Sequence, residues 1–174
     1  MVELLLKKGS LIDAIDKDNN TPLHLAIIGG HTRIAELILN EGSSITALDN
    51  NGKSLLHHAV LSNNAATVDL FLRKGDLTGV IDKDNNTPLH LALKSNYYQI
   101  AELIIRQGSS IDAMDNDGNS PLHLAAQKSY YSLVTLLLSK GASHNAVNKN
   151  NKRPYSLASN YDTQRAFNRY NIYG

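Results

Sequence analysis

Four histidines at equal intervals are the residues of this sequence whose type and spacing could do chemistry. His24, His57, His90 and His123 follow one another at a step of 33 residues, and imidazole serves both proton transfer and zinc binding. If each histidine lies on its own helix, the helices lie roughly 8–10 Å apart, whereas zinc needs nitrogens about 2.0–2.1 Å from one ion. We therefore expect structural histidines, each bonded to the Thr or Ser hydroxyl that caps its helix and to nearby loop backbone.

Four aspartates recur at the same step, and each begins a polar loop: Asp16, Asp49, Asp82 and Asp115. Two carboxylates about 5–9.5 Å apart could act on a glycosidic bond, and the repeat spacing does not exclude that distance. Active sites are usually asymmetric, however, so one residue type in one repeated position is better explained by bonding to the turn backbone. The sequence has no G-x-S-x-G, P-loop, dinucleotide-binding or H-E-x-x-H motif. We predict no enzyme, and no catalytic, cofactor-binding or metal-binding residue.

The residues around each histidine predict the elements that position it. The letters "TPLHLA" occupy residues 21–26 and 87–92, "SPLHLA" occupies 120–125, and "SLLHHA" at 54–59 is a looser copy. Thr and Ser are preferred N-caps, and Pro suits the first helical position. The first copy therefore predicts a short helix from Pro22 that stops at Gly29 and Gly30, followed by a second helix that Gly42 ends.

Gly and Asn exchange at two fixed positions of the repeat, which indicates a requirement of the backbone. Both residue types tolerate a positive φ angle better than most others. We expect positive φ where the first helix ends and in the loop before it. The helix-end residues are Gly30, Asn63, Asn96 and Ser129, and the loop residues are Asn19, Gly52, Asn85, Gly118 and Asn151.

With these motifs the chain resembles the ankyrin-repeat family, whose 33-residue unit carries T-P-L-H-x-A between a turn and two antiparallel helices. The resemblance implies an all-α fold, an ankyrin-repeat α-solenoid of stacked helix-turn-helix units with β-hairpin-like loops, in a single domain over 1–174. Stacking would bury a core that no single unit could bury alone. By phase, the units are a partial repeat (1–15), four full repeats (16–48, 49–81, 82–114, 115–147) and a C-terminal cap repeat (148–174).

Departures from the motif predict local differences. Leu55 replaces Pro and His58 replaces Leu, so we expect the repeat 49–81 to be the least regular. In the repeat 82–114, we expect Leu103 to be a core residue of the second helix.

The resemblance implies that partners meet the loop tips and the exposed side of the first helix, which together line a concave groove. We predict partner binding by tip residues and by first-helix residues at fixed positions of the repeat. The tip residues are Lys17, Asn20, Asn50, Lys53, Lys83, Asn86, Asn116, Asn119 and Lys152, and the helix residues are Ile28, Leu61, Lys94, Gln127 and Lys128.

Two tyrosine pairs at 97–98 and 130–131 lie one repeat apart. This spacing predicts that Tyr98 stands near Tyr131 and Tyr97 near Tyr130. The rings either fill the seam between stacked helices or are exposed. If exposed, Tyr98 and Tyr131 favour a partner on the C-terminal half, because tyrosine offers a large rigid surface with one polar tip.

Composition limits the remaining function classes. The chain is 42% hydrophobic and 19% charged, with a formal net charge of +1, no cysteine and no apolar run long enough to span a bilayer. A basic C-terminal end favours a solvated cap over phosphate binding, because the whole chain lacks a broad basic face. We expect a monomeric cytoplasmic protein that binds another protein, with no nucleic acid, membrane or cofactor as partner.

Two further hypotheses stay open from the sequence. The chain starts inside a second helix, so it could be a targeting or regulatory arm of a larger protein, such as a secreted effector of an intracellular microbe acting in host cytoplasm. The family resemblance also implies Asn145 as an asparagine that a hydroxylase could modify.

Overall fold

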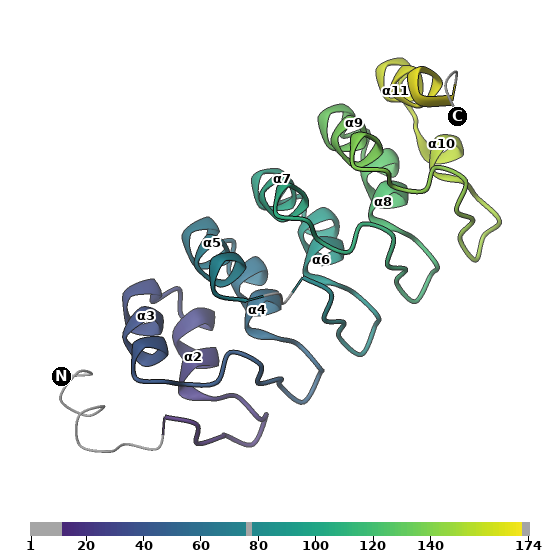
Figure 1. Ribbon diagram of the computed structural model, residues 1–174. Helices are drawn as coiled ribbons and strands as arrows, with labels where there is room; N and C mark the ends of the chain where they lie inside the picture. Colours follow the sequence, from purple (N-terminus) through teal and green to yellow (C-terminus); the bar gives the residue numbers. More distant parts are fainter. Residues whose placement is uncertain (1–11, 76–77, 172–174) are drawn as a thin grey trace. The chain divides into compact units, whose positions relative to one another are not determined.

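The computed structural model describes residues 12–75 and 78–171. Most of the predicted partial repeat over 1–15 lies outside these residues. The chain forms two compact units, Met1–Lys83 and Asp84–Gly174, and each is built from pairs of short helices joined by loops (Figure 1).

The first unit contains two helix pairs. They are α2 (Pro22–Ile28) with α3 (Thr32–Asn40), and α4 (Leu55–Leu61) with α5 (Ala65–Lys74). Within each pair the two helices pack together, and α2 also packs on α4. This stacking buries Leu23, Leu55, Leu56 and Phe71 completely, so the core lies between successive first helices and beneath the second ones.

The second unit contains three helix pairs. They are α6 (Pro88–Lys94) with α7 (Tyr98–Arg106), α8 (Pro121–Gln127) with α9 (Tyr131–Ser139), and α10 (Pro154–Leu157) with α11 (Tyr161–Asn171). The first helices stack as α6, α8 and α10, and the second helices as α7, α9 and α11. The helix α10 is a single turn, and Arg153 at its N-cap provides no side-chain hydrogen bond.

The helix starts follow the sequence as expected. Thr21, Ser54, Thr87 and Ser120 are N-caps in extended conformation, and each side chain accepts a hydrogen bond from the backbone N–H of the histidine that follows. Although Leu55 replaces proline, α4 has the same length as α2 and α6. The expected irregularity of repeat 49–81 is therefore absent from its first helix, because the Ser54 cap suffices to start it.

The backbone angles confirm the two predicted positive-φ positions. All nine residues have φ between 51° and 73°: Gly30, Asn63, Asn96 and Ser129 at the helix ends, and Asn19, Gly52, Asn85, Gly118 and Asn151 in the loops. Among the described residues the loops contain no strand, only one isolated bridge between Leu48 and Ser54. The loops are thus turns held by other contacts.

One expected core residue is placed differently. Leu103 on α7 is half-buried, whereas the next residue, Ile104, is completely buried. The buried side of α7 consists of Ile100, Ala101, Ile104 and Ile105, so the helix faces the core about one residue further along than the apolar pattern indicated.

Candidate functional site

The repeated histidines are structural side chains, as the sequence predicted. In all four copies Nδ1 lies 3.1–3.2 Å from the backbone nitrogen of the N-cap residue and accepts its hydrogen bond. In His90 and His123 the other nitrogen, Nε2, donates 3.0 Å bonds to the carbonyls of Asn119 and Lys152 in the following loop. These two histidines therefore fix the position of the next repeat's loop.

Electrostatics agree with this role. Burial lowers the pKa of His90 and of His123 below the ordinary value of 6.5. A neutral ring with its proton on Nε2 satisfies both contacts at once. Among the described residues, no group of three His, Asp or Glu side chains is arranged to hold a metal ion. The four repeated histidines do not converge on one point as zinc ligands must.

The repeated aspartates hold turns. Oδ1 of Asp49 accepts 2.8 Å bonds from the backbone N–H groups of Asn51 and Lys53, and Asp115 does the same for Asp117 and Asn119. Burial raises the pKa of Asp49 and of Asp115, but hydrogen bonds to backbone and to neighbouring side chains outweigh it and keep both below 3.8. Carboxylates engaged in this way are poor proton acceptors, so they do not form a general acid–base pair.

His58, which is not one of the four repeated histidines, forms a cluster of titratable side chains in the first unit. Nε2 of His58 lies 3.1 Å from Oδ2 of Asp49, and its ring packs edge-on against His24 with centroids 5.4 Å apart. Burial, followed by repulsion from His58, lowers the pKa of His24 to about 4. Nε2 of His24 has no hydrogen-bond partner among the described residues. His58 occupies the position where the motif has leucine. The neighbouring His24 has fewer hydrogen bonds than His90.

Neighbouring loop tips are linked through their main chains. Backbone N–H groups of Asn50 and Lys83 donate to the carbonyls of Asp18 and Asn51 at 2.9 Å. In the second unit, Asn116 and Lys149 donate to Asp84 and Asp117 at 3.2 and 3.0 Å. Each tip is therefore held by the tip before it, and its outward side chains start from a fixed backbone.

The structure places most predicted site residues of the first unit on its surface. Ile28 and Leu61 are 49% and 42% exposed. Three side chains are partly engaged by the protein itself. Asn20 donates to Oδ2 of Asp16 at 3.1 Å, Asn50 donates to the carbonyl of Lys17 at 3.0 Å, and Nζ of Lys53 lies 3.9 Å from Oδ2 of Asp82. Lys17, Asn50 and Lys83 are exposed.

In the second unit, four predicted residues bond to other side chains of the protein. Asn116 and Asn119 accept from Asn85 and Asn148 at 2.6 and 2.8 Å. Asn86 is buried, and its side-chain oxygen accepts a 2.6 Å bond from Lys94. Nζ of Lys94 also lies 2.9 Å from Oδ2 of the buried Asp115. We take this ion pair to satisfy that carboxylate oxygen, because 2.9 Å is a good hydrogen-bond distance. The residues left on the surface are Asn116, Gln127, Lys128 and Lys152, with Asn119 half-buried.

The tyrosines pair differently from the expectation. Tyr98 packs edge-on against Tyr130, with ring centroids 5.9 Å apart, rather than against Tyr131. The Tyr130 hydroxyl donates to Oδ1 of Asn96 at 3.1 Å, so this pair fills the seam between α7 and α9. Tyr131 is 46% exposed and is the member of the four most open to a partner.

Sequence reasoning missed a set of exposed apolar side chains. Leu25 on α2 is 51% exposed, although its equivalent on α8, Leu124, is buried. One apolar residue also precedes each loop turn at the repeat step and is exposed: Ile15, Leu48, Ile81, Met114 and Val147. The constant spacing was the signal that could have found this set.

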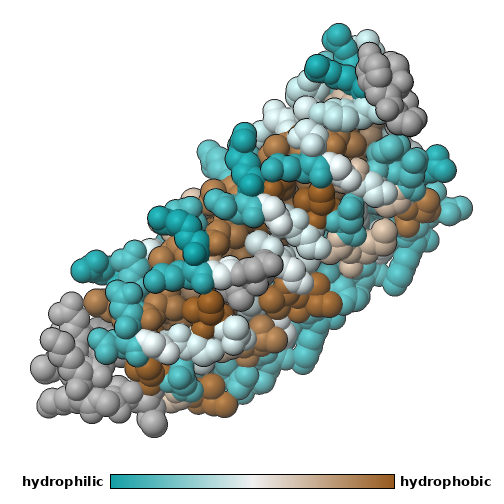
Figure 2. Space-filling model, in the orientation of Figure 1, coloured by the Kyte–Doolittle hydropathy of each residue, from teal (hydrophilic) through white to brown (hydrophobic). Residues whose placement is uncertain are grey.

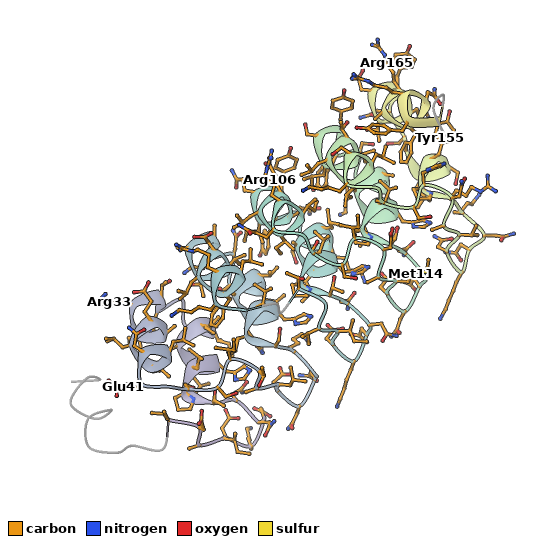
Figure 3. All side chains as sticks on the ribbon, in the orientation of Figure 1. Arg33, Glu41, Arg106, Met114, Tyr155 and Arg165 are labelled. Atoms are coloured by element: carbon orange, nitrogen blue, oxygen red, sulfur yellow. The ribbon has the colours of Figure 1, made fainter. Side chains whose placement is uncertain are left out.

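The second unit has a hollow of about 680 Å³ between its first helices and its loop tips. Its lining includes Lys128 at the C-cap of α8, Lys152 and Asp117 from the loops, and the apolar Leu124 and Leu157. Figure 3 shows side chains extending from both the helices and the loops of the repeats. The hollow joins the predicted helix and tip residues in one surface.

Asn145, the proposed hydroxylation position, is exposed, and its side-chain nitrogen lies 3.1 Å from Nε2 of His144. Its modification stays a prediction. No helix among the described residues combines the length and apolarity needed to cross a bilayer.

Comparisons with known proteins agree with the fold. A family model described as ankyrin repeats (3 copies) matches residues 1–78 and 56–150. No curated protein matches the chain significantly. The solved structures contain 538 matching chains, so the architecture is common and does not point to one activity. One of them is the crystal structure of the ankyrin repeat domain of Bcl-3, described as a unique member of the IkappaB protein family. It has 26% sequence identity and a TM-score of 0.87, over 95% of this chain and 75% of that one.

Proposed function

The chain belongs to the ankyrin-repeat family, and from that premise we propose that it is a non-catalytic module that binds another protein through its loop tips and first helices. Ankyrin repeats are generally protein-interaction modules. The observation that carries the proposal is that one set of side chains stabilises the fold and another set is exposed. The repeated histidines and aspartates are consumed by internal hydrogen bonds, whereas variable residues at fixed positions are exposed.

The two units offer different chemistry to a partner. In the first unit the exposed helix residues are apolar, namely Leu25, Ile28 and Leu61. In the second unit the exposed residues at the ends of α6 and α8 are polar or basic, namely Lys94, Gln127 and Lys128. Figure 2 shows hydrophilic side chains at the loop tips and along the outer ends of the second helices, with hydrophobic residues between them. We propose that a partner is recognised by apolar contact with the first unit and by polar contact with the second.

The test is affinity capture from cell lysate with variants of each surface. One variant carries Leu25→Ser, Ile28→Ser and Leu61→Ser, and a second carries Gln127→Ala, Lys128→Ala and Lys152→Ala. The matched control replaces exposed residues on or just after the second helices, with Arg33→Ala, Arg73→Ala and Lys140→Ala.

Equal circular-dichroism spectra and denaturation midpoints come first, so that a loss of binding is not a loss of folding. We expect a protein that the wild type and the control retain and that at least one surface variant loses. Retention of the same proteins by both surface variants would contradict the proposed surface.

A further inference from the structure

We propose that the hollow of the second unit binds an acidic segment of the partner, whose carboxylates meet the ammonium groups of Lys128 and Lys152. This inference rests on the proposed protein-binding function and names the chemistry of its partner. The observation that carries it is that two exposed lysines line one hollow together with leucines. Lys128 lies at the C-cap of α8 and Lys152 lies in a loop.

The charge of the lining favours an anion. Three lysines and one aspartate line the hollow: Lys94, Lys128, Lys152 and Asp117. The Lys94 ammonium already pairs with the buried Asp115. Within the part of the chain that the structure describes, the ammonium groups of Lys128 and Lys152 have no ion-pair or hydrogen-bond partner. Two uncompensated cations thus face one carboxylate, which leaves a local excess of positive charge.

The internal hydrogen bonds hold these lysines in place. The backbone carbonyl of Lys152 accepts from His123, and its N–H donates to Oδ1 of Asn148 at 2.9 Å. Asn148 in turn donates to Asn119 at 2.8 Å. The N–H of Lys128 donates to the carbonyl of Leu124 at the end of α8. Binding of a partner therefore reduces the conformational entropy of the lysine side chains but not that of the backbone that carries them.

The lining also distinguishes carboxylates from phosphates. Asp117 would repel a doubly charged phosphate more strongly than a single carboxylate. The half-buried Leu157 and buried Leu124 offer apolar contact to aliphatic side chains beside the carboxylates. An acidic peptide with interspersed leucines fits this combination.

The test uses the full chain and a short fluorescein-labelled peptide of alternating glutamate and leucine, followed by fluorescence anisotropy at low and high salt. The comparison peptide has glutamine in place of glutamate. The charge-reversal variant is Lys128→Glu with Lys152→Glu, and the matched control is Lys140→Glu with Arg165→Glu. Lys140 follows α9, Arg165 lies on α11 (Figure 3), and neither lines the hollow.

We expect saturable binding of the glutamate peptide that weakens with salt. Binding should weaken by more than about tenfold in the charge-reversal variant and with the glutamine peptide, and it should change little in the control. Carbodiimide cross-linking, which joins a carboxylate to a lysine amine, should link the peptide to Lys128 or Lys152 in a peptide map.

Three results would overturn the inference: no saturable binding, equal loss in the control, or tighter binding of a single-stranded oligonucleotide or phosphopeptide than of the glutamate peptide. The failure is distinguishable from that of the proposed function. If a captured protein depends on Gln127, Lys128 and Lys152 but the acidic peptide does not bind, protein binding stands and its acidic chemistry is wrong.

Discussion

At the scale of the residue, identical motif letters have different surroundings. His24 and His90 occupy the same position in "TPLHLA" and make the same Nδ1 contact with their caps. Only His90 has a bonded Nε2, because the loop of the following repeat brings the carbonyl of Asn119 within 3.0 Å. The repeated histidines therefore contribute unequally to the stability of the stacked repeats, although they occupy the same position of the motif.

Replacing His90 with alanine should cost roughly 2–4 kcal/mol of unfolding free energy, through a cavity, a lost cap contact and an unpaired carbonyl. His24→Ala should cost less, because Nε2 of His24 lacks a well-aligned hydrogen bond and interacts only weakly with the backbone of Lys53. Urea denaturation at neutral pH measures both. Equal midpoints for the two variants would show that the bond to Asn119 contributes nothing.

The cluster around His58 predicts a pH dependence of stability. Burial lowers the pKa of His58 more than Asp49 raises it, and Lys53 lowers it further; the neighbouring His24 is lowered to about 4. A histidine with a lowered folded-state pKa contributes stability that is complete above 6.5 and is lost as the pH falls below it. Each such group costs up to about 1.4 kcal/mol per pH unit below 6.5.

The variant His58→Leu removes one of these titrations and the repulsion on His24. Between pH 7.5 and 5 we expect the wild type to lose stability more steeply than His58→Leu. At pH 7.5 the variant should be nearly neutral, because leucine occupies the same position in the other full repeats. Parallel curves of unfolding free energy against pH would refute this account of the cluster.

At the scale of the element, the sequence predicts helices and turns better than it predicts their rotation. Caps, prolines and Gly or Asn stops act locally, so the starts of the helices and the positive-φ turns are all readable from the letters. Which side of a second helix is buried depends on packing against its neighbours, and the apolar pattern of α7 allows more than one rotation. For the same reason the contact of Tyr98 with Tyr130, and the exposure of Leu25, could not be read from spacing alone.

The two adjacent residues on α7 test this rotation directly. Ile104→Ala should destabilise by roughly 2–5 kcal/mol, because it empties a fully buried site. Leu103→Ala should cost clearly less, since the side chain is half-buried. Thermal or urea unfolding of the two variants gives the comparison, and a larger loss for Leu103→Ala would mean that α7 is turned the other way.

Two glycines with positive φ, Gly118 and Gly141, differ in the space around them. A Cβ on Gly118 would lie 3.0 Å from the backbone nitrogen of Lys149, at a φ of +73°, whereas one on Gly141, at +87°, would meet nothing within 4 Å. Alanine at either site costs about 1–2 kcal/mol for the left-handed backbone. Gly118→Ala should cost more, since it also pushes the next loop away, and melting temperatures should rank the two variants accordingly.

At the scale of the whole molecule, the sequence predicted the repeat architecture, because it follows from the 33-residue period. The positions that face a partner stay a prediction. The sequence did not predict which of those positions are consumed internally. Asn86 and Lys94 have the residue types of a surface, yet both bond within the protein. That distinction arises only when adjacent repeats are brought together.

Salt should separate the contributions of the two units to partner binding. Screening shortens the range of exposed charges from about 10 Å at 0.1 M to about 3 Å at 1 M salt, but leaves apolar contact intact. Raising the salt should therefore weaken the wild type toward the level of Lys128→Ala with Lys152→Ala, and should hardly change that variant further. Titration of a captured partner by calorimetry measures this, and equal salt slopes for both proteins would contradict a role for these lysines.

Four bonds between neighbouring loop tips use main-chain atoms alone, and each joins the N–H of Asn50, Lys83, Asn116 or Lys149 to a carbonyl of the preceding tip. These four bonds require no particular side chain, although side chains such as those of Asn50 and Asn148 add further bonds between tips. Side chains at the tips can therefore change to suit a new partner while the main-chain bonds between the tips remain.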